Sequence, residues 1–122
     1  MEDKGLQEAI PSYVDYVRDE IAVQTHSDEI AGKLREMGFS YIGRGKRRGA
    51  MSRRVIRKDE EHDHQKVAAA LQPLIDLGLA FSSGRNWCPL EVATHYRDKG
   101  MLKGKLRNIY WTGPGKWHLR EV

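Results

Sequence analysis

The sequence predicts an α+β fold, a small helical bundle with attached β-hairpins. Three observations lead to this prediction: four segments have apolar residues at helical spacing, three shorter segments are rich in aromatic and branched residues, and a glycine follows three of the four helical segments. A length of 122 residues matches one domain, so residues 1–122 are expected to form a single domain. Residues 1–9 are mostly polar, which predicts a flexible N-terminus.

Two helices are expected in the first third of the chain. A helix over 12–23 is predicted by four apolar residues that follow a spacing of about 3.6 residues, Tyr13, Val14, Val17 and Ile21. The second helix, over 27–37, has Ser27 as its N-cap and two acidic residues in its first turn. Gly38 follows this helix and is expected to end it.

Two more helices are expected in the second half. The helix over 64–77 contains Pro73, which lacks an amide donor and is expected to bend or split it. The helix over 89–99 begins at Pro89, a residue that suits the first turn, and ends at Gly100. Each of these helices therefore has a start or stop signal of its own.

Three hairpins complete the predicted fold. Residues 40–57 are expected to form a long hairpin or a loop, because branched and aromatic residues flank a tip rich in glycine and basic residues. A short hairpin over 79–87 is expected to turn at Ser82-Ser83-Gly84, and a last hairpin over 107–121 at Gly113-Pro114-Gly115. The helix ends also share a pattern, in which a glycine cap precedes an apolar residue and extended chain, at Gly38, Gly78 and Gly100.

The net charge of +4 is unevenly distributed along the chain. Residues 1–40 hold four basic and nine acidic residues, which gives −5, whereas residues 41–58 hold eight basic residues and no acid, which gives +8. Residues 59–122 hold nine basic and eight acidic residues, which gives +1. A concentrated excess of this kind creates a local potential able to hold a polyanion.

The basic segment 41–58 is therefore the main candidate binding site, either as a β-hairpin or as a loop inserted between two helices. Guanidinium groups match phosphate oxygens, and glycine allows close approach of the backbone. The alternative is a solvated loop that the acidic N-terminal segment neutralises. The candidate phosphate-binding residues here are Arg44, Lys46, Arg47, Arg48, Arg53, Arg54, Arg57 and Lys58.

A second basic stretch adjoins aromatic residues near the C-terminus. Lys103, Lys105 and Arg107 precede an aromatic segment, and cations beside aromatic rings suit stacking against exposed bases. Packing in the core is the stronger interpretation for Trp87 and Trp111, whereas Trp117 lies beside a turn and is the better candidate for exposure.

No catalytic, metal or cofactor site is expected. His62-Asp63-His64 could suggest a metal site, but residues two apart point away from each other on a helix. The single cysteine, Cys88, excludes an internal disulfide, and no signal peptide or membrane-spanning run is evident, which favours a cytoplasmic protein. The chain is therefore expected not to be an enzyme.

The segment from His64 to Pro89 combines a helix, the run Leu77-Gly-Leu-Ala-Phe and a Ser-Ser-Gly turn. In this order of features it resembles the recognition helix and wing of winged helix-turn-helix domains, with Ser27 to Gly38 as the preceding helix and residues 12–88 as the widest cover. The resemblance implies that the third helix docks in a DNA groove, with base-reading roles for Gln65, Lys66 and Gln72. The chain departs from that family because more than twenty residues replace the tight turn between the two helices.

The combined expectation is a nucleic-acid-binding protein with DNA as its partner, acting in transcription regulation or as an accessory factor of a phage or mobile element. The first alternative is RNA binding through the aromatic C-terminal hairpin. The second is a protein-interaction module that binds a larger machine such as RNA polymerase. The sequence gives no expectation for the oligomeric state or the target sequence.

Overall fold

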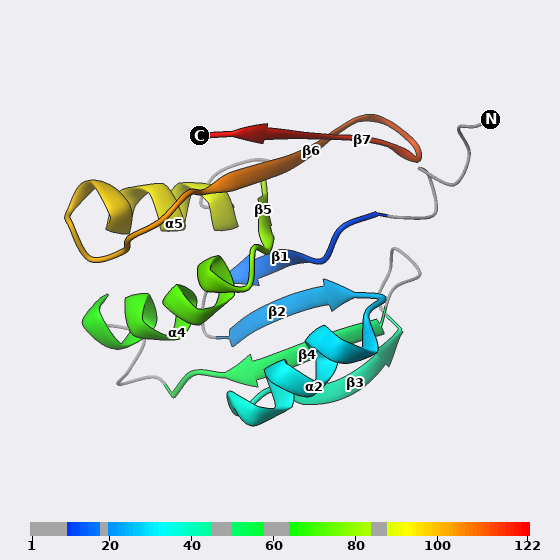
Figure 1. Ribbon diagram of the computed structural model, residues 1–122, viewed down its shortest axis with the longest axis horizontal. Coiled ribbons are helices and arrows are strands. Elements are labelled where there is room, and N and C mark those ends of the chain that lie inside the picture. Colours follow the sequence, from blue (N-terminus) through cyan, green and yellow to red (C-terminus); the bar gives the residue numbers. More distant parts are fainter. Residues whose placement is uncertain (1–9, 18–19, 45–49, 58–63, 84–87) are drawn as a thin grey trace.

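The computed structural model describes residues 10–17, 20–44, 50–57, 64–83 and 88–122. Within these ranges the chain forms three helices and seven strands (Figure 1). Their order is β1 (Tyr13–Val17), β2 (Glu20–Thr25), α2 (Asp28–Glu36), β3 (Ser40–Arg44), β4 (Ala50–Val55), α4 (His64–Asp76), β5 (Ala80–Ser82), α5 (Pro89–Asp98), β6 (Arg107–Gly113) and β7 (Lys116–Glu121).

The seven strands of the described residues belong to one mixed sheet, in the order β3-β4-β2-β1-β5-β6-β7. The short strand β5 pairs in parallel with both β1 and β6. All other neighbouring strands pair antiparallel. Helices on a continuous mixed sheet confirm the predicted α+β class.

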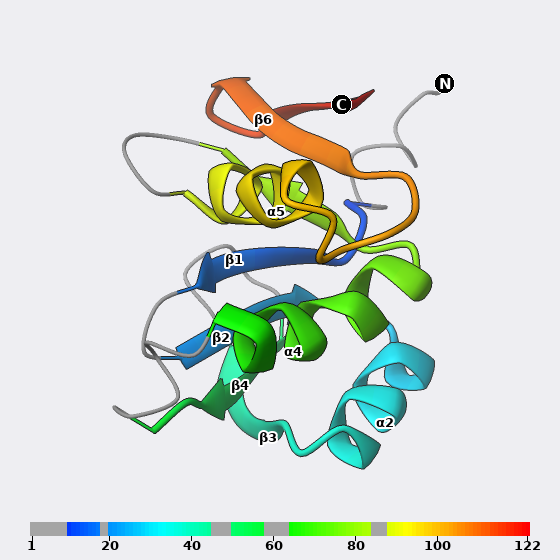
Figure 2. The same cartoon turned by 90° about the vertical axis from the view of Figure 1, so that its left-hand side faces the viewer.

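The helices α2, α4 and α5 form one layer over a single face of the sheet (Figure 2). Successive strand residues point to opposite faces, so Val14 enters the main core and Tyr13 does not. The main core joins strand residues such as Val14, Val23 and Phe81 to helix residues such as Leu34, Leu71 and Ala93. On the other face a smaller cluster forms around three buried residues, Tyr13, Ala80 and Ile109.

The helix predicted over 12–23 is wrong, because this segment forms the antiparallel strands β1 and β2. A β-bulge explains the misleading spacing. The register shifts between Val14 and Tyr16, so the extra residue places Val14 and Val17 on the same face. A separation of three residues, which is typical of a helix, thus arises here in a strand.

The hairpin predicted over 79–87 is also wrong in its described part. Ala80–Ser82 forms β5, and both of its sheet neighbours, β1 and β6, run parallel to it, so it is not one arm of a hairpin. Its three residues are buried, as is typical of a strand covered on both faces. Residues 84–87 lie outside the described ranges.

The remaining predicted elements are confirmed. The helices over 27–37, 64–77 and 89–99 correspond to α2, α4 and α5, and the hairpins over 40–57 and 107–121 correspond to β3–β4 and β6–β7. The helix α4 continues through Pro73 in its last turn and is not split. No helix in the described residues is long and apolar enough to cross a lipid bilayer.

The three predicted glycine caps share one geometry. Gly38, Gly78 and Gly100 all have positive φ angles, of 97°, 81° and 78°. In each case the amide of the next residue reaches back to the helix, as Leu79 N donates to the Leu74 carbonyl at 3.1 Å. The amide of each glycine also donates to a carbonyl of the last helical turn, as Gly78 N donates to the Ile75 carbonyl at 2.9 Å. These two hydrogen bonds satisfy carbonyls that the helix end leaves without partners, and the chain turns back toward the sheet.

Candidate nucleic-acid interface

The described parts of the basic segment 41–58 include the antiparallel strands β3 and β4, which lie at one edge of the sheet. Arg44 ends β3 and pairs with Ala50, the first residue of β4. The hairpin lies between α2 and α4 in the chain, as the sequence predicts. Four of the predicted phosphate-binding residues lie outside the described ranges, namely Lys46, Arg47, Arg48 and Lys58.

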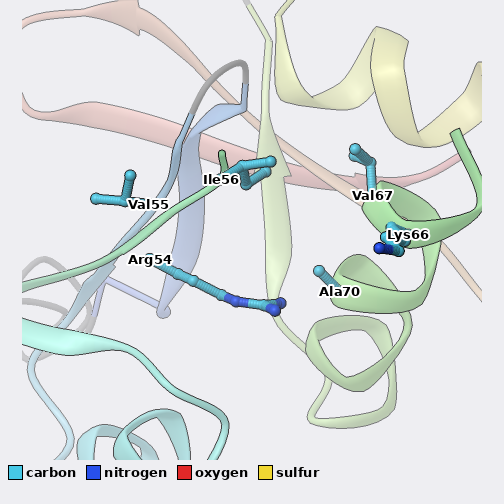
Figure 3. A pocket seen from close by; sticks show the side chains of 6 residues that line it. All are labelled: Arg54, Val55, Ile56, Lys66, Val67 and Ala70. Atoms are coloured by element: carbon cyan, nitrogen blue, oxygen red, sulfur yellow. The ribbon is translucent and has the colours of Figure 1, made fainter. Parts of the chain in front are cut away.

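Strand β4 sends its two arginines to opposite faces of the sheet. Arg53 pairs with Ala22 on the face without helices, and its Nε lies 2.8 Å from Oε1 of Glu20. Arg54 pairs with Ile21, a core residue, and its side chain points toward α4 (Figure 3). The charge of Arg53 is therefore partly neutralised within the protein, and the charge of Arg54 is directed to the helical side.

Arg54 and Lys66 line one small hollow between the end of β4 and the start of α4 (Figure 3). The apolar side chains of Ile56, Val67 and Ala70 complete its wall. The half-buried Arg54 makes no hydrogen bond or ion pair in the described part of the chain. Arg54 and Lys66 therefore place two positive charges beside an apolar wall, where they raise the local positive potential.

The outer side of α4 is exposed between Arg54 of β4 at one edge and the loop that contains Lys103 at the other. Its residues advance by about 100° each, and one side is buried, through Val67, Ala68, Leu71, Leu74 and Ile75. The opposite side exposes Gln65, Lys66 and Ala69. Ala70 borders this exposed side toward Arg54, and Gln72 borders it on the other edge.

Gln72 fixes the loop that carries the second basic stretch. Its Oε1 accepts a hydrogen bond from the amide of Lys103 at 2.9 Å, and its Nε2 donates to the Lys103 carbonyl at 2.8 Å. The same Nε2 donates to Oδ1 of Asp76 at 3.1 Å. The side-chain amide of Gln72 therefore holds the loop. Because both of its polar atoms already have partners, this amide has few hydrogen bonds left for the base-reading role that the winged-helix resemblance implies.

The loop lies tightly against α4. A Cβ atom added to Gly104, which has a φ of 109°, would lie 3.1 Å from Cγ2 of Ile75. The side chains of Lys103 and Lys105 are exposed on this loop, and Lys105 Nζ is 3.7 Å from Oε2 of Glu121. The second basic stretch is thus placed along the edge of α4 that faces away from Arg54.

The other predicted site residues occupy varied positions. The guanidinium of Arg107 donates to the carbonyl of Gly78, so this residue braces the end of α4 against β6. Trp117 is partly buried and packs with Trp111 against the smaller apolar cluster. Arg57 is exposed after β4, and Gln65 is exposed in the first turn of α4. Arg57 and Gln65 thus lie in the two segments that border the hollow, whereas Arg107 and Trp117 support packing.

Comparison with known protein families, curated proteins and solved structures finds no match. The chemistry of the α4 surface is therefore the basis for assigning a role. The described residues contain no group of three or more His, Cys, Asp or Glu side chains that could hold a metal ion. His62 and Asp63 lie outside those residues.

The sequence reasoning missed two arrangements. It did not identify Gln72 as an anchor for the basic loop, since no local pattern links residues 31 positions apart. It also missed Arg120, which lies over the ring of Tyr110 in the last hairpin. The alternation of residues along β6 and β7 would have placed these two side chains on one face once the turn was known.

Proposed function

We propose that this protein binds duplex DNA through the outer side of α4. One observation carries the proposal: two basic segments far apart in the sequence border the two edges of the same helix. Arg54 and Lys66 lie at one edge, and the loop with Lys103 and Lys105 is hydrogen-bonded to the other. Cations on both sides of an exposed helix suit contacts to the two phosphate backbones that border a groove.

The dimensions of α4 support this mode of binding. Its 13 residues span about 20 Å, and a major groove about 12 Å wide admits an α-helix. Ala69 and Ala70 lie in the middle of the helix, and their small side chains allow the DNA to approach closely. Gln65 and Lys66, at the N-terminal end, are the candidates for contacts to base edges.

The basic hairpin is proposed to add phosphate contacts beside α4. Arg57 follows β4, and Lys46, Arg47 and Arg48 lie between β3 and β4 in the sequence. Phosphate contacts of this kind fix the position of a protein on DNA without reading its sequence. The proposed role is that of a DNA-binding regulator or accessory factor, and it does not depend on the winged-helix resemblance.

Duplex binding by single and double variants tests the proposal. Lys66→Gln and Lys103→Gln each remove one cation, from opposite edges of α4, and the double variant removes both. We expect each single change to weaken binding of a labelled duplex, and the two losses to add, since Lys66 and Lys103 lie at opposite edges of α4. The exposed Arg35 on α2 gives the matched control, Arg35→Gln.

Two results would contradict the proposal. The first is a double variant that binds the duplex as tightly as the native chain. The second is a control variant that loses as much affinity as the double variant, because the attraction would then depend on total charge and not on the α4 edges. Tight capture of an acidic protein with no duplex affinity would favour the protein-interaction alternative instead.

A further inference from the structure

The terminal hairpin separates its side chains into two chemically different faces. Ile109, Trp111 and Trp117 lie on the apolar face and form part of the smaller cluster. The opposite face carries two directly opposed pairs, Asn108 with Arg120 and Tyr110 with His118. The second face therefore combines a cation with two stacked rings, in what is here named the Arg120 ladder (Asn108, Tyr110, Thr112, His118 and Arg120).

Asn108 fixes the cation of the ladder. This residue is fully buried, and its Nδ2 donates to the carbonyls of Phe81 and Ile109 at 3.0 and 3.1 Å. Its Oδ1 accepts a hydrogen bond from Nε of Arg120 at 2.9 Å. The guanidinium carbon of Arg120 lies 5.1 Å from the ring centroid of Tyr110, a favourable position for a cation–π contact.

The two rings continue the ladder toward the turn. Tyr110 and His118 have ring centroids 5.3 Å apart and an angle of 24° between their planes, which is a stacked arrangement. Nε2 of His118 lies 3.0 Å from Oγ1 of Thr112, so the imidazole is held at its edge as well as on one face. The rings are thus oriented before any ligand arrives.

Binding capacity remains at both ends of the ladder. Arg120 and His118 are exposed, and neither Nη of Arg120 nor the second face of His118 has a partner among the described residues. The neighbouring acid, Glu121, alternates to the other face, where it lies near Lys105. The helix α5 meets this hairpin at the C-terminal end, where Nη1 of Arg97 donates to the Val122 carbonyl, and the turn lies at the other end (Figure 1).

We propose that the Arg120 ladder binds an unpaired nucleotide of a single-stranded nucleic acid, independently of the α4 surface. The base stacks on the open face of His118, and the phosphate accepts hydrogen bonds from the Nη groups of Arg120. An oriented ring beside an arginine that no described acid neutralises matches a ligand that joins an aromatic group to an anion. A duplex does not fit this site, because its bases are already stacked on each other.

Fluorescence anisotropy with labelled oligothymidylate, oligouridylate and a blunt duplex tests the proposal. The affinity of His118→Ala for single strands should be lower than that of the native chain by about 5-fold to about 140-fold, the range expected for the loss of one stacked base. Arg120→Gln should also weaken it, whereas Arg35→Gln and duplex affinity should not change. The two oligonucleotides distinguish DNA from RNA as the source of the unpaired base.

Unchanged single-strand affinity in both ladder variants would overturn the proposal, as would equal competition by polyglutamate, which carries charge without bases. In the native chain, the ring protons of His118 should shift in NMR spectra on addition of oligothymidylate, and their failure to shift would refute stacking there. The failure of the α4 proposal is separate, because Lys66→Gln and Lys103→Gln should weaken duplex binding and leave the ladder intact.

Discussion

Replacement of Arg54 by methionine should separate stability from binding. The side chain of Arg54 lies between β4 and α4, the residue is half-buried, and it makes no hydrogen bond or ion pair in the described residues. A cation removed from water without a compensating partner costs free energy in the folded state. Methionine keeps an unbranched apolar stem beside Ala70 and removes the charge.

Arg54→Met should have opposite effects on the two properties: stability should rise slightly and duplex affinity should fall. Because Arg54 retains contact with solvent, we expect Arg54→Met to change the free energy of unfolding by only about 0 to 1 kcal/mol, toward greater stability. Loss of one charge-assisted phosphate contact should cost about 1.5 kcal/mol of duplex binding, roughly a tenfold rise in Kd. The slope of log affinity against log salt should become shallower by about 0.9.

Urea denaturation followed by tryptophan fluorescence measures the first quantity, and duplex titration across a salt series measures the second. Arg54→Lys is the matched variant, because it keeps the charge and loses the forked donors, so its affinity should lie between those of the native chain and Arg54→Met. A destabilisation of Arg54→Met by more than about 1 kcal/mol would refute the reasoning, since it would make the guanidinium a structural group. Unchanged duplex affinity would refute the binding role.

Three further changes have defined outcomes. Gly78→Ala should lower stability by about 1 kcal/mol in urea denaturation because φ is 81° there, and Gly78→Asn should lower it less. Gln72→Leu should remove both hydrogen bonds to Lys103, seen as faster hydrogen exchange of the Lys103 amide and weaker duplex binding. Burial raises the pKa of Tyr96 above its ordinary value of 10.0, so the unfolded chain ionises first and stability should fall as pH rises above 10. Urea curves of Tyr96→Phe on both sides of pH 10 should lack this part of the loss.

Local signals predicted the helices with clear ends. Ser27 caps α2 by accepting a hydrogen bond from the Ile30 amide at 3.2 Å, and Gly38, Gly78 and Gly100 end the three helices. These signals act over a few residues, so they can be read without knowledge of the rest of the fold. The hairpins β3–β4 and β6–β7 were predictable for the same reason, because each pairs segments that are close in sequence.

Long-range pairing explains the errors. The position of β5 in the sheet is set by its pairing with β1 and β6, and β1 lies more than sixty residues earlier in the chain. The bulge in β1 also imitates helical spacing, and only pairing with β2 reveals it. The two candidate sites depend on similar distant contacts, since Gln72 reaches Lys103 and Asn108 reaches Phe81.

The salt dependence of duplex binding by an Arg54→Gln/Lys66→Gln/Lys103→Gln variant tests the role of α4 most directly. The native chain should lose affinity steeply as salt rises, and the slope of the triple variant should be shallower by about 2 to 3, because each lost phosphate contact contributes about 0.9. The control Arg35→Gln should keep the native slope. A triple variant that folds and keeps the native slope would contradict the assignment of duplex binding to the two edges of α4.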